Sequence, residues 1–168
     1  MAKTYPKRLE DFAKRYVPLL RTYLQREETR DIDKVIRDEL VKRMQGLIDQ
    51  LNDAKQKLVD NKVLTGLDIL DRASHKLEKI RDSIKFAARG YSGIFDLEVM
   101  GNDQLNRLLE YDQMLFDKVA ILSTALNEAL SKSGDIKTAL SGLDSQIKDF
   151  EATLDNRDNY ARERKAGK

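Results

Sequence analysis

Apolar side chains recur along most of this chain at alternating intervals of three and four residues, the spacing of one face of an α-helix. Four long rows of this kind run through residues 31–60, 70–87, 103–132 and 135–163. Their seams are Leu40, Met44, Leu47, Leu51, Ala54 and Leu58; Leu70, Ala73, Leu77, Ile80, Ile84 and Ala87; Leu105, Leu108, Leu115, Val119, Leu122, Leu126 and Ala129; and Ile136, Leu140, Leu143, Ile147, Phe150 and Leu154. The pattern predicts an all-α fold of long helices with coiled-coil-like packing.

Two interruptions divide these rows into helical hairpins. The larger is residues 86–101, FAARGYSGIFDLEVMG, which hold three of the eight glycines and separate a hairpin over 31–89 from a second over 103–164. The smaller lies near residues 60–65, where the apolar phase slips and the sequence TGLD has the spacing of a capping box. We expect a turn there, although one unbroken helix through a stutter fits the same slip. Two hairpins joined by a Gly-rich connector over 90–102 predict an elongated antiparallel bundle.

Residues 1–30 have the pattern of an additional amphipathic helix that contains a proline. The apolar face of this helix consists of Leu9, Phe12, Tyr16, Leu19 and Tyr23. Pro18 removes one helical hydrogen bond and clashes with the preceding turn. We therefore expect a Pro-kinked helix, or two short helices that meet near Tyr16 and Val17, packed alongside the bundle or across its end.

The row over 103–132 is apolar on two sides, because a second stripe accompanies the main seam. This second stripe consists of Tyr111, Met114, Ile121 and Ala125. A helix that is apolar on two faces is surrounded by neighbours, so we expect it to be the central helix. Asp112 falls inside the main seam. A buried carboxylate costs several kcal/mol unless it is paired, so Asp112 is expected to meet a basic partner that sets the register, to face a wet rim, or to make a polar contact in a cavity.

The ends and glycines of the helices give further expectations. Gly46 and Gly142 fall inside predicted helices at outward positions, where each costs about 1 kcal/mol relative to Ala. Beyond Leu154 the apolar stripe is lost, so the chain is expected to fray toward a basic tail at 165–168.

Length and composition change this picture little. The 168 residues are expected to form one domain over 1–168, and their net charge of +2 gives no global field that would attract nucleic acid. The absence of cysteine excludes disulfides, thiol nucleophiles and thiolate metal sites. The sequence has neither an apolar leader nor an apolar run of about 18 residues, so a cytoplasmic protein is expected.

The sequence carries no recognisable catalytic or ligand-binding signature. His75 is the single histidine, with Asp71 and Glu78 at helical spacing, and one histidine cannot supply a di-iron bundle site. A solvated polar stripe explains these three residues better. Phosphate-binding loops, dinucleotide fingerprints and the nucleophile elbow are missing. We therefore expect no enzyme, no catalytic residues and no cofactor, and an all-carboxylate Mg²⁺ or Ca²⁺ site between helices stays open.

The architecture favours a non-enzymatic scaffold, adaptor or assembly subunit that binds protein partners or a second copy of itself as a homodimer. The apolar residues of the connector are either a plug over one end of the core or a docking site. The candidate partner-binding residues are Tyr91, Ile94, Phe95, Leu97 and Met100.

Two alternatives involve other surfaces. The N-terminal segment has the composition of an interfacial helix that binds a membrane peripherally. Its candidate membrane-facing residues are Lys7, Arg8, Phe12, Lys14, Arg15 and Leu19. The basic stretch 72–89, together with the tail that contains Arg157, is a weaker candidate for nucleic acid, because acidic residues are interleaved with the basic ones.

Overall fold

The computed structural model describes residues 7–25, 32–87, 101–131 and 135–166. Every regular element in these ranges is an α-helix, which confirms the predicted all-α class. The helices are α1 (Lys7–Arg15), α2 (Leu20–Gln25), α3 (Ile32–Asp60), α4 (Leu67–Ala87), α5 (Asn102–Ser131), α6 (Ile136–Leu140) and α7 (Leu143–Ala166).

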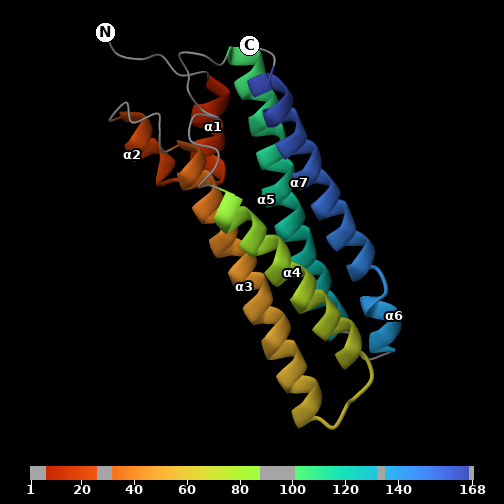
Figure 1. Cartoon of the computed structure of the whole chain (residues 1–168). Coiled ribbons are helices and arrows are strands. Elements are labelled where there is room, and N and C mark those ends of the chain that lie inside the picture. The colour runs from red at the N-terminus through yellow and green to blue at the C-terminus, as the bar shows by residue number, and fades with distance from the viewer. Residues whose placement is uncertain (1–6, 26–31, 88–100, 132–134, 167–168) are drawn as a thin grey trace.

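The four long helices form an elongated bundle, and the short ones lie at its two ends (Figure 1). Helix α3 packs against α4, and α5 packs against α7, as two antiparallel hairpins. Between the hairpins, α3 contacts α5 and α4 contacts α7. Helices α3 and α5 are parallel, because Arg43 lies over the Phe116 ring and Gln50, two turns on, binds Ser123. Helix α1 lies against α5 at one end, and α6 lies near α4 at the other.

The core is one continuous cluster of buried apolar side chains that includes residues of all seven described helices. The predicted seams of α3, α4, α5 and α7 supply most of it, since the Leu, Ile and Phe residues of these seams are nearly all buried. Because each helix buries its stripe against at least two others, this shared core is what fixes the mutual placement of the hairpins.

The turn between α3 and α4 excludes the alternative of one continuous rod over 31–88. Helix α3 ends at Asp60, and the backbone then turns back with Lys62 at φ 58°. The amide of Val63 donates to the Leu58 carbonyl at 2.8 Å, and the amide of Lys62 donates to Val59 at 2.9 Å. These two bonds form a Schellman motif with lysine at the left-handed position. Gly66, at φ 90°, directly precedes α4, so it takes the capping position expected for Thr65.

Near Pro18 the chain forms two short helices, one of the two outcomes predicted from its proline. Helix α1 ends at Arg15 and α2 begins at Leu20. The turn between them is closed by a hydrogen bond from the Leu20 amide to the Val17 carbonyl at 2.9 Å. Because Val17 and Leu20 are both buried, this break lets the segment fold its apolar face onto the bundle.

Three expectations about the second hairpin are wrong. The single helix over 135–163 is interrupted, because α6 ends at Leu140 and Ser141 bonds back to the Thr138 carbonyl, so Gly142 lies between two helices rather than inside one. The chain beyond Leu154 does not fray, because α7 continues to Ala166 and buries Arg157. The second stripe of α5 is not covered, because its members Met114 and Ile121 are exposed.

Candidate functional site

The most unusual feature of the described core is a network of charged side chains between α3, α5 and α7. Arg157 of α7 is 1% exposed, and its Nε donates to Oδ1 of Asp112 on α5 at 2.5 Å. Its Nη2 donates to Oδ1 of Asp33 on α3 at 2.9 Å. The second oxygen of Asp33 accepts a 2.8 Å bond from Nε of Arg37. Asp158 lies at the edge, 3.5 Å from Arg157 and 3.7 Å from Arg37.

The network has two guanidinium groups and three carboxylates, so its formal charge is −1 when all five groups are ionised. Burial disfavours the charge on Arg157, but the carboxylates of Asp112 and Asp33 outweigh it and raise the Arg157 pKa. Burial also raises the pKa of the Asp112 carboxyl above its ordinary value of 3.8, while Arg157 opposes this rise. The cluster therefore links three helices, and burial disfavours the charge of Asp112 within it.

The chemistry open to this cluster is limited by its own ion pairs. The inward-facing carboxylates of Asp33 and Asp112 are both occupied by guanidinium groups. Among the described residues, no group of three acids, histidines or cysteines is placed to hold a metal ion. The ion pairs therefore connect α3, α5 and α7 within the core.

Asp112 was the buried polar candidate of the sequence, and the structure places it at 2% exposure with a basic partner. Sequence reasoning missed Arg157, which it had assigned to a fraying tail. The signal was nevertheless present, because Arg157 continues the three- and four-residue spacing of the α7 seam after Leu154 and before the buried Ala161.

The candidate membrane-facing residues of the N-terminal segment divide into two sets. The Phe12 ring is buried against Tyr16 and Phe116, with ring centroids 5.1 and 5.8 Å away. This placement contradicts a membrane-facing role for Phe12, because its apolar surface is already used by the core. The exposed set is basic apart from Leu19, and consists of Lys7, Arg8, Lys14, Arg15 and Leu19.

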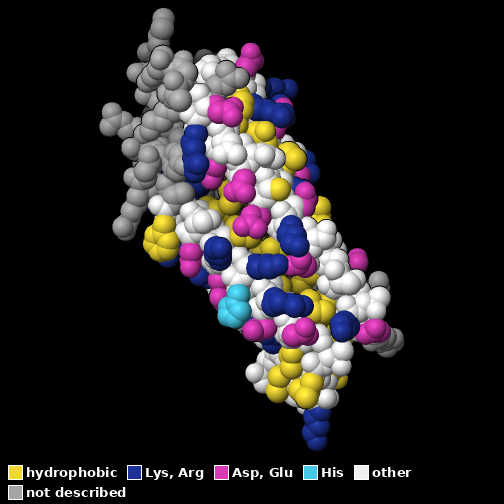
Figure 2. All heavy atoms as spheres, turned by 45° about the vertical axis from the view of Figure 1, so that its right-hand side comes forward, with side chains coloured by type: hydrophobic (Ala, Val, Ile, Leu, Met, Phe, Trp, Pro, Cys, Tyr) yellow, Lys and Arg dark blue, Asp and Glu magenta, His cyan; other side chains and the backbone are white. Residues whose placement is uncertain are grey.

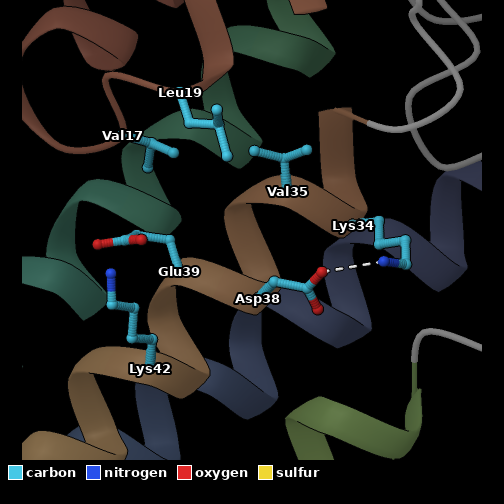
Figure 3. A pocket seen from close by; sticks show the side chains of 7 residues that line it. All are labelled: Val17, Leu19, Lys34, Val35, Asp38, Glu39 and Lys42. Atoms are coloured by element: carbon cyan, nitrogen blue, oxygen red, sulfur yellow. Dashed lines mark hydrogen bonds and ion pairs between the residues drawn. The ribbon is translucent and has the colours of Figure 1, made fainter.

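A shallow groove of about 490 Å³ lies between the α1–α2 turn and the first turns of α3 (Figure 3). Val17, Leu19 and Val35 lie on its apolar side. Two lysines and two acids line the remainder, with Lys34 bonded to Asp38 at 3.0 Å. Because both signs of charge alternate along α3, the groove presents no concentrated field for an ionic ligand.

Among the residues that the structure describes, five of the seven large apolar side chains that stand exposed fall into two groups. The first, which we call the apolar tip, is Val59, Val63 and Leu64 at the α3–α4 turn. Figure 2 shows hydrophobic side chains gathered at this lower end of the molecule. The second, the α5 outer face, is centred on Met114 and Ile121, which are 46% and 54% exposed.

The charged surface has basic and acidic side chains interleaved on the face seen in Figure 2. Lys76 of α4 pairs with Asp144 of α7, and Lys55 of α3 pairs with Asp71 of α4. His75 is exposed, 3.5 Å from both Asp71 and Glu78. The basic residues of α4 thus share their surface with acids, as a solvated polar face does.

The candidate partner-binding residues of the connector lie outside the described part of the chain. These residues are Tyr91, Ile94, Phe95, Leu97 and Met100. Their assignment therefore stays a prediction from the sequence.

Comparison with family models, with curated proteins and with solved structures returned no match. In the described ranges, no helix combines the length and the apolar character needed to cross a membrane.

Proposed function

We propose that this helical bundle works through protein–protein contacts, as a scaffold, adaptor or assembly subunit, and that it performs no catalysis. The observation that carries the proposal is the grouping of exposed apolar residues into the apolar tip and the α5 outer face. Exposed apolar residues scattered singly need no explanation, whereas grouped ones mark interaction surfaces.

The two groups lie apart from one another on the molecule. The apolar tip is at the α3–α4 turn, at one end of the bundle, and the α5 outer face is on the side of the second hairpin. A rigid, elongated bundle with separate apolar surfaces can hold two partners at a fixed separation, which is the physical requirement for a scaffold.

The proposal includes a cytoplasmic location. A chain without cysteine needs no oxidising compartment to complete its fold. Fractionation of the native cells tests the location independently of the partner experiment.

Photo-crosslinking in the native cells tests the function. A photoreactive phenylalanine analogue replaces Asn61 beside the apolar tip, or Thr124 beside the α5 outer face, so that the apolar side chains themselves stay intact. We expect discrete protein adducts from these positions, because interface residues bring a partner within reach of the probe. Matched variants carry the same probe at Lys79 and Glu151, which are exposed among charged neighbours.

Adducts confined to positions 61 and 124 support the proposal. Equal labelling at all four positions indicates collision with abundant proteins and counts against it. If none of the probes captures a protein, the scaffold function is wrong.

A further inference from the structure

The α5 outer face has the composition of a surface that binds itself. Met114 and Ile121 are seven residues apart on one side of the helix, about 10.5 Å along its axis at 1.5 Å per residue. Asp117 and Lys118 lie between them. Two turns beyond each apolar residue the same side carries a charge, with Arg107 toward the start of α5 and Glu128 toward its end.

An antiparallel copy of α5 complements this face residue by residue. When the two-fold axis passes between Asp117 and Lys118, Met114 lies opposite Ile121 of the second copy. The same axis places Arg107 opposite Glu128 of the second copy. Asp117 and Lys118 lie on opposite flanks of this line, and they stay bonded to Tyr16 and Asp149 of their own chain. Each apolar residue therefore meets an apolar residue, and the charges at the two ends of the face, Arg107 and Glu128, meet their opposites.

We propose that the partner of the α5 outer face is a second copy of this chain, bound antiparallel across a two-fold axis between residues 117 and 118. The inference rests on the proposed function and names one of its partners. Two-fold contacts are the commonest way in which identical subunits associate, and they require a self-complementary surface of this kind. An unrelated partner imposes no such symmetry on the sequence of α5.

Charged side chains of the α5 outer face are already bonded within their own chain before association. Lys118 is bonded to Asp149 of α7, and Asp117 accepts a 2.9 Å hydrogen bond from the Tyr16 hydroxyl. Arg107 is bonded to Glu110 at 2.8 Å and lies 5.0 Å from the centre of the Tyr111 ring. These contacts restrict the side chains before the second copy binds, which lowers the entropy cost of association.

The contact has a small apolar centre of two residues from each copy, so we expect a weak, reversible dimer. Interfaces well below the standard size bind weakly, and a dissociation constant on the order of 10–100 µM is consistent with this contact. The fraction of the chain that is dimeric is therefore expected to rise with protein concentration.

Sedimentation equilibrium of the full chain tests the dimer and its surface. We expect Ile121→Lys to raise the dissociation constant more than about tenfold, because a charge replaces the apolar centre of the contact. The matched control is Leu64→Lys, which makes the same change at an exposed residue of the apolar tip and leaves the dimer unchanged. Both sites are exposed, so circular dichroism should show unaltered helicity.

Charge reversal tests the register. Arg107→Glu opposes Glu128 of the second copy and weakens the dimer, and Arg107→Glu combined with Glu128→Arg restores it. A face that served merely to keep α5 folded would show no such rescue, because residues 107 and 128 are about 30 Å apart along one helix.

Disulfide trapping gives a second measure of the register. Because the chain has no cysteine of its own, only the introduced cysteines can form disulfides. Under mild oxidation, a mixture of Met114→Cys and Ile121→Cys should form the mixed disulfide. Each variant alone should form few disulfides, because its cysteine and that of the copy are about 10 Å apart along the helices, beyond the Cα separation of about 7 Å that a disulfide spans.

A monomer at all concentrations up to about 1 mM overturns the inference. A dimer that is insensitive to Ile121→Lys, or that gives no preference for the mixed disulfide, also overturns it. If position 124 captures a different protein while the chain is monomeric, the inference fails and the proposed function stands. If the chain is monomeric and no probe captures any protein, both fail.

Discussion

Lys62 holds a backbone conformation that glycine adopts at no steric cost. It occupies the left-handed position of the motif that ends α3, at φ 58°. For a residue with a β-carbon, this conformation costs about 1–2 kcal/mol relative to a right-handed one. The hairpin therefore forms in spite of this residue, through the buried seams on either side of the turn.

We expect Lys62→Gly to stabilise the protein by about 0.5–1 kcal/mol, because it removes the strain and keeps both hydrogen bonds of the turn. Urea unfolding followed by circular dichroism measures the change. Gly46 is the opposite case, a glycine in the middle of helix α3, where a β-carbon would meet nothing within 4 Å. Gly46→Ala should also stabilise, by about 1 kcal/mol. A loss of stability in Lys62→Gly would show that the lysine side chain stabilises the fold by more than its backbone strain destabilises it.

At the level of elements, the network around Arg157 connects three helices that are distant in sequence. Asp33 belongs to α3, Asp112 to α5 and Arg157 to α7. Removing one partner from a buried pair leaves an uncompensated charge in the core, which costs more than the pair itself contributes.

We expect Arg157→Leu to lower the free energy of unfolding by about 3–5 kcal/mol, because it leaves Asp112 and Asp33 without their shared partner. The combined change Arg157→Leu with Asp112→Asn should recover part of the loss, since one of the abandoned charges is then removed. Arg72→Leu is the matched control, because Arg72 pairs with Asp68 on the exposed side of α4 and should change stability by less than about 0.5 kcal/mol. An equal loss in both leucine variants would contradict a special role for the network.

Phe12 of helix α1 and Tyr16, which directly follows that helix, attach the N-terminal segment to the core. The rings of Phe12, Tyr16 and Phe116 lie within 6 Å of one another, and Arg43 of α3 donates to the Tyr16 carbonyl at 2.5 Å. The N-terminal segment is thereby held by both hairpins.

We expect Phe12→Ala to destabilise the protein by about 3–5 kcal/mol, the cost of emptying a buried aromatic site. Lys14→Ala, on the exposed side of the same helix, should change stability by less than about 0.5 kcal/mol. Urea titration with and without anionic lipid vesicles measures both variants. If Phe12→Ala leaves stability unchanged but lowers vesicle binding, the packing assigned to this helix is wrong and the membrane alternative is favoured.

The long seams of α3, α4 and α5 could be predicted from the sequence because apolar side chains recur at every third or fourth position along them, with Asp112 as the exception in α5. The interruption at Ser141–Gly142 could not, because the seam continues through it from Leu140 to Leu143, and a periodicity that both structures share does not distinguish one helix from two. The burial of Arg157 does not follow from apolar spacing, because a charged residue after Leu154 marks the end of the apolar stripe of α7. Its partner Asp112 was found because apolar residues flank it on both sides.

At the scale of the whole molecule, carboxyl groups whose pKa values change on folding make the free energy of unfolding depend on pH. The pKa of the Glu110 carboxyl is lowered chiefly by its bond from Arg107, and the pKa values of Asp135 and Asp144 are lowered chiefly by bonds from Thr138 and Lys76. Asp135 is exposed to solvent, and Glu110 and Asp144 are half-exposed. Their contribution to stability is present above their ordinary pKa values and is lost as the pH falls through the lowered ones.

Asp112 acts in the opposite direction, and its effect can be isolated by comparison with a variant. Burial raises the pKa of Asp112, and Arg157 opposes this rise. On α3, the charge of Asp33 raises the pKa further and the charge of Arg37 lowers it. The folded protein therefore binds a proton at Asp112 at pH values where the unfolded chain, with a pKa near 3.8, does not. The stability gained from this proton is fully present below 3.8 and is lost as the pH rises through the raised value.

We therefore expect the difference in unfolding free energy, wild type minus Asp112→Asn, to increase as the pH is lowered from 7 toward 4. The exposed carboxyls titrate alike in both proteins, so their losses cancel in the difference. Urea titrations at pH 7, 6, 5 and 4 measure it, with Asp144→Asn as a control whose difference should shrink toward acid, because the pKa of Asp144 is lowered. If the Asp112→Asn difference also shrinks, Asp112 keeps its charge through Arg157, and the core network is held by ion pairing more strongly than it is weakened by burial.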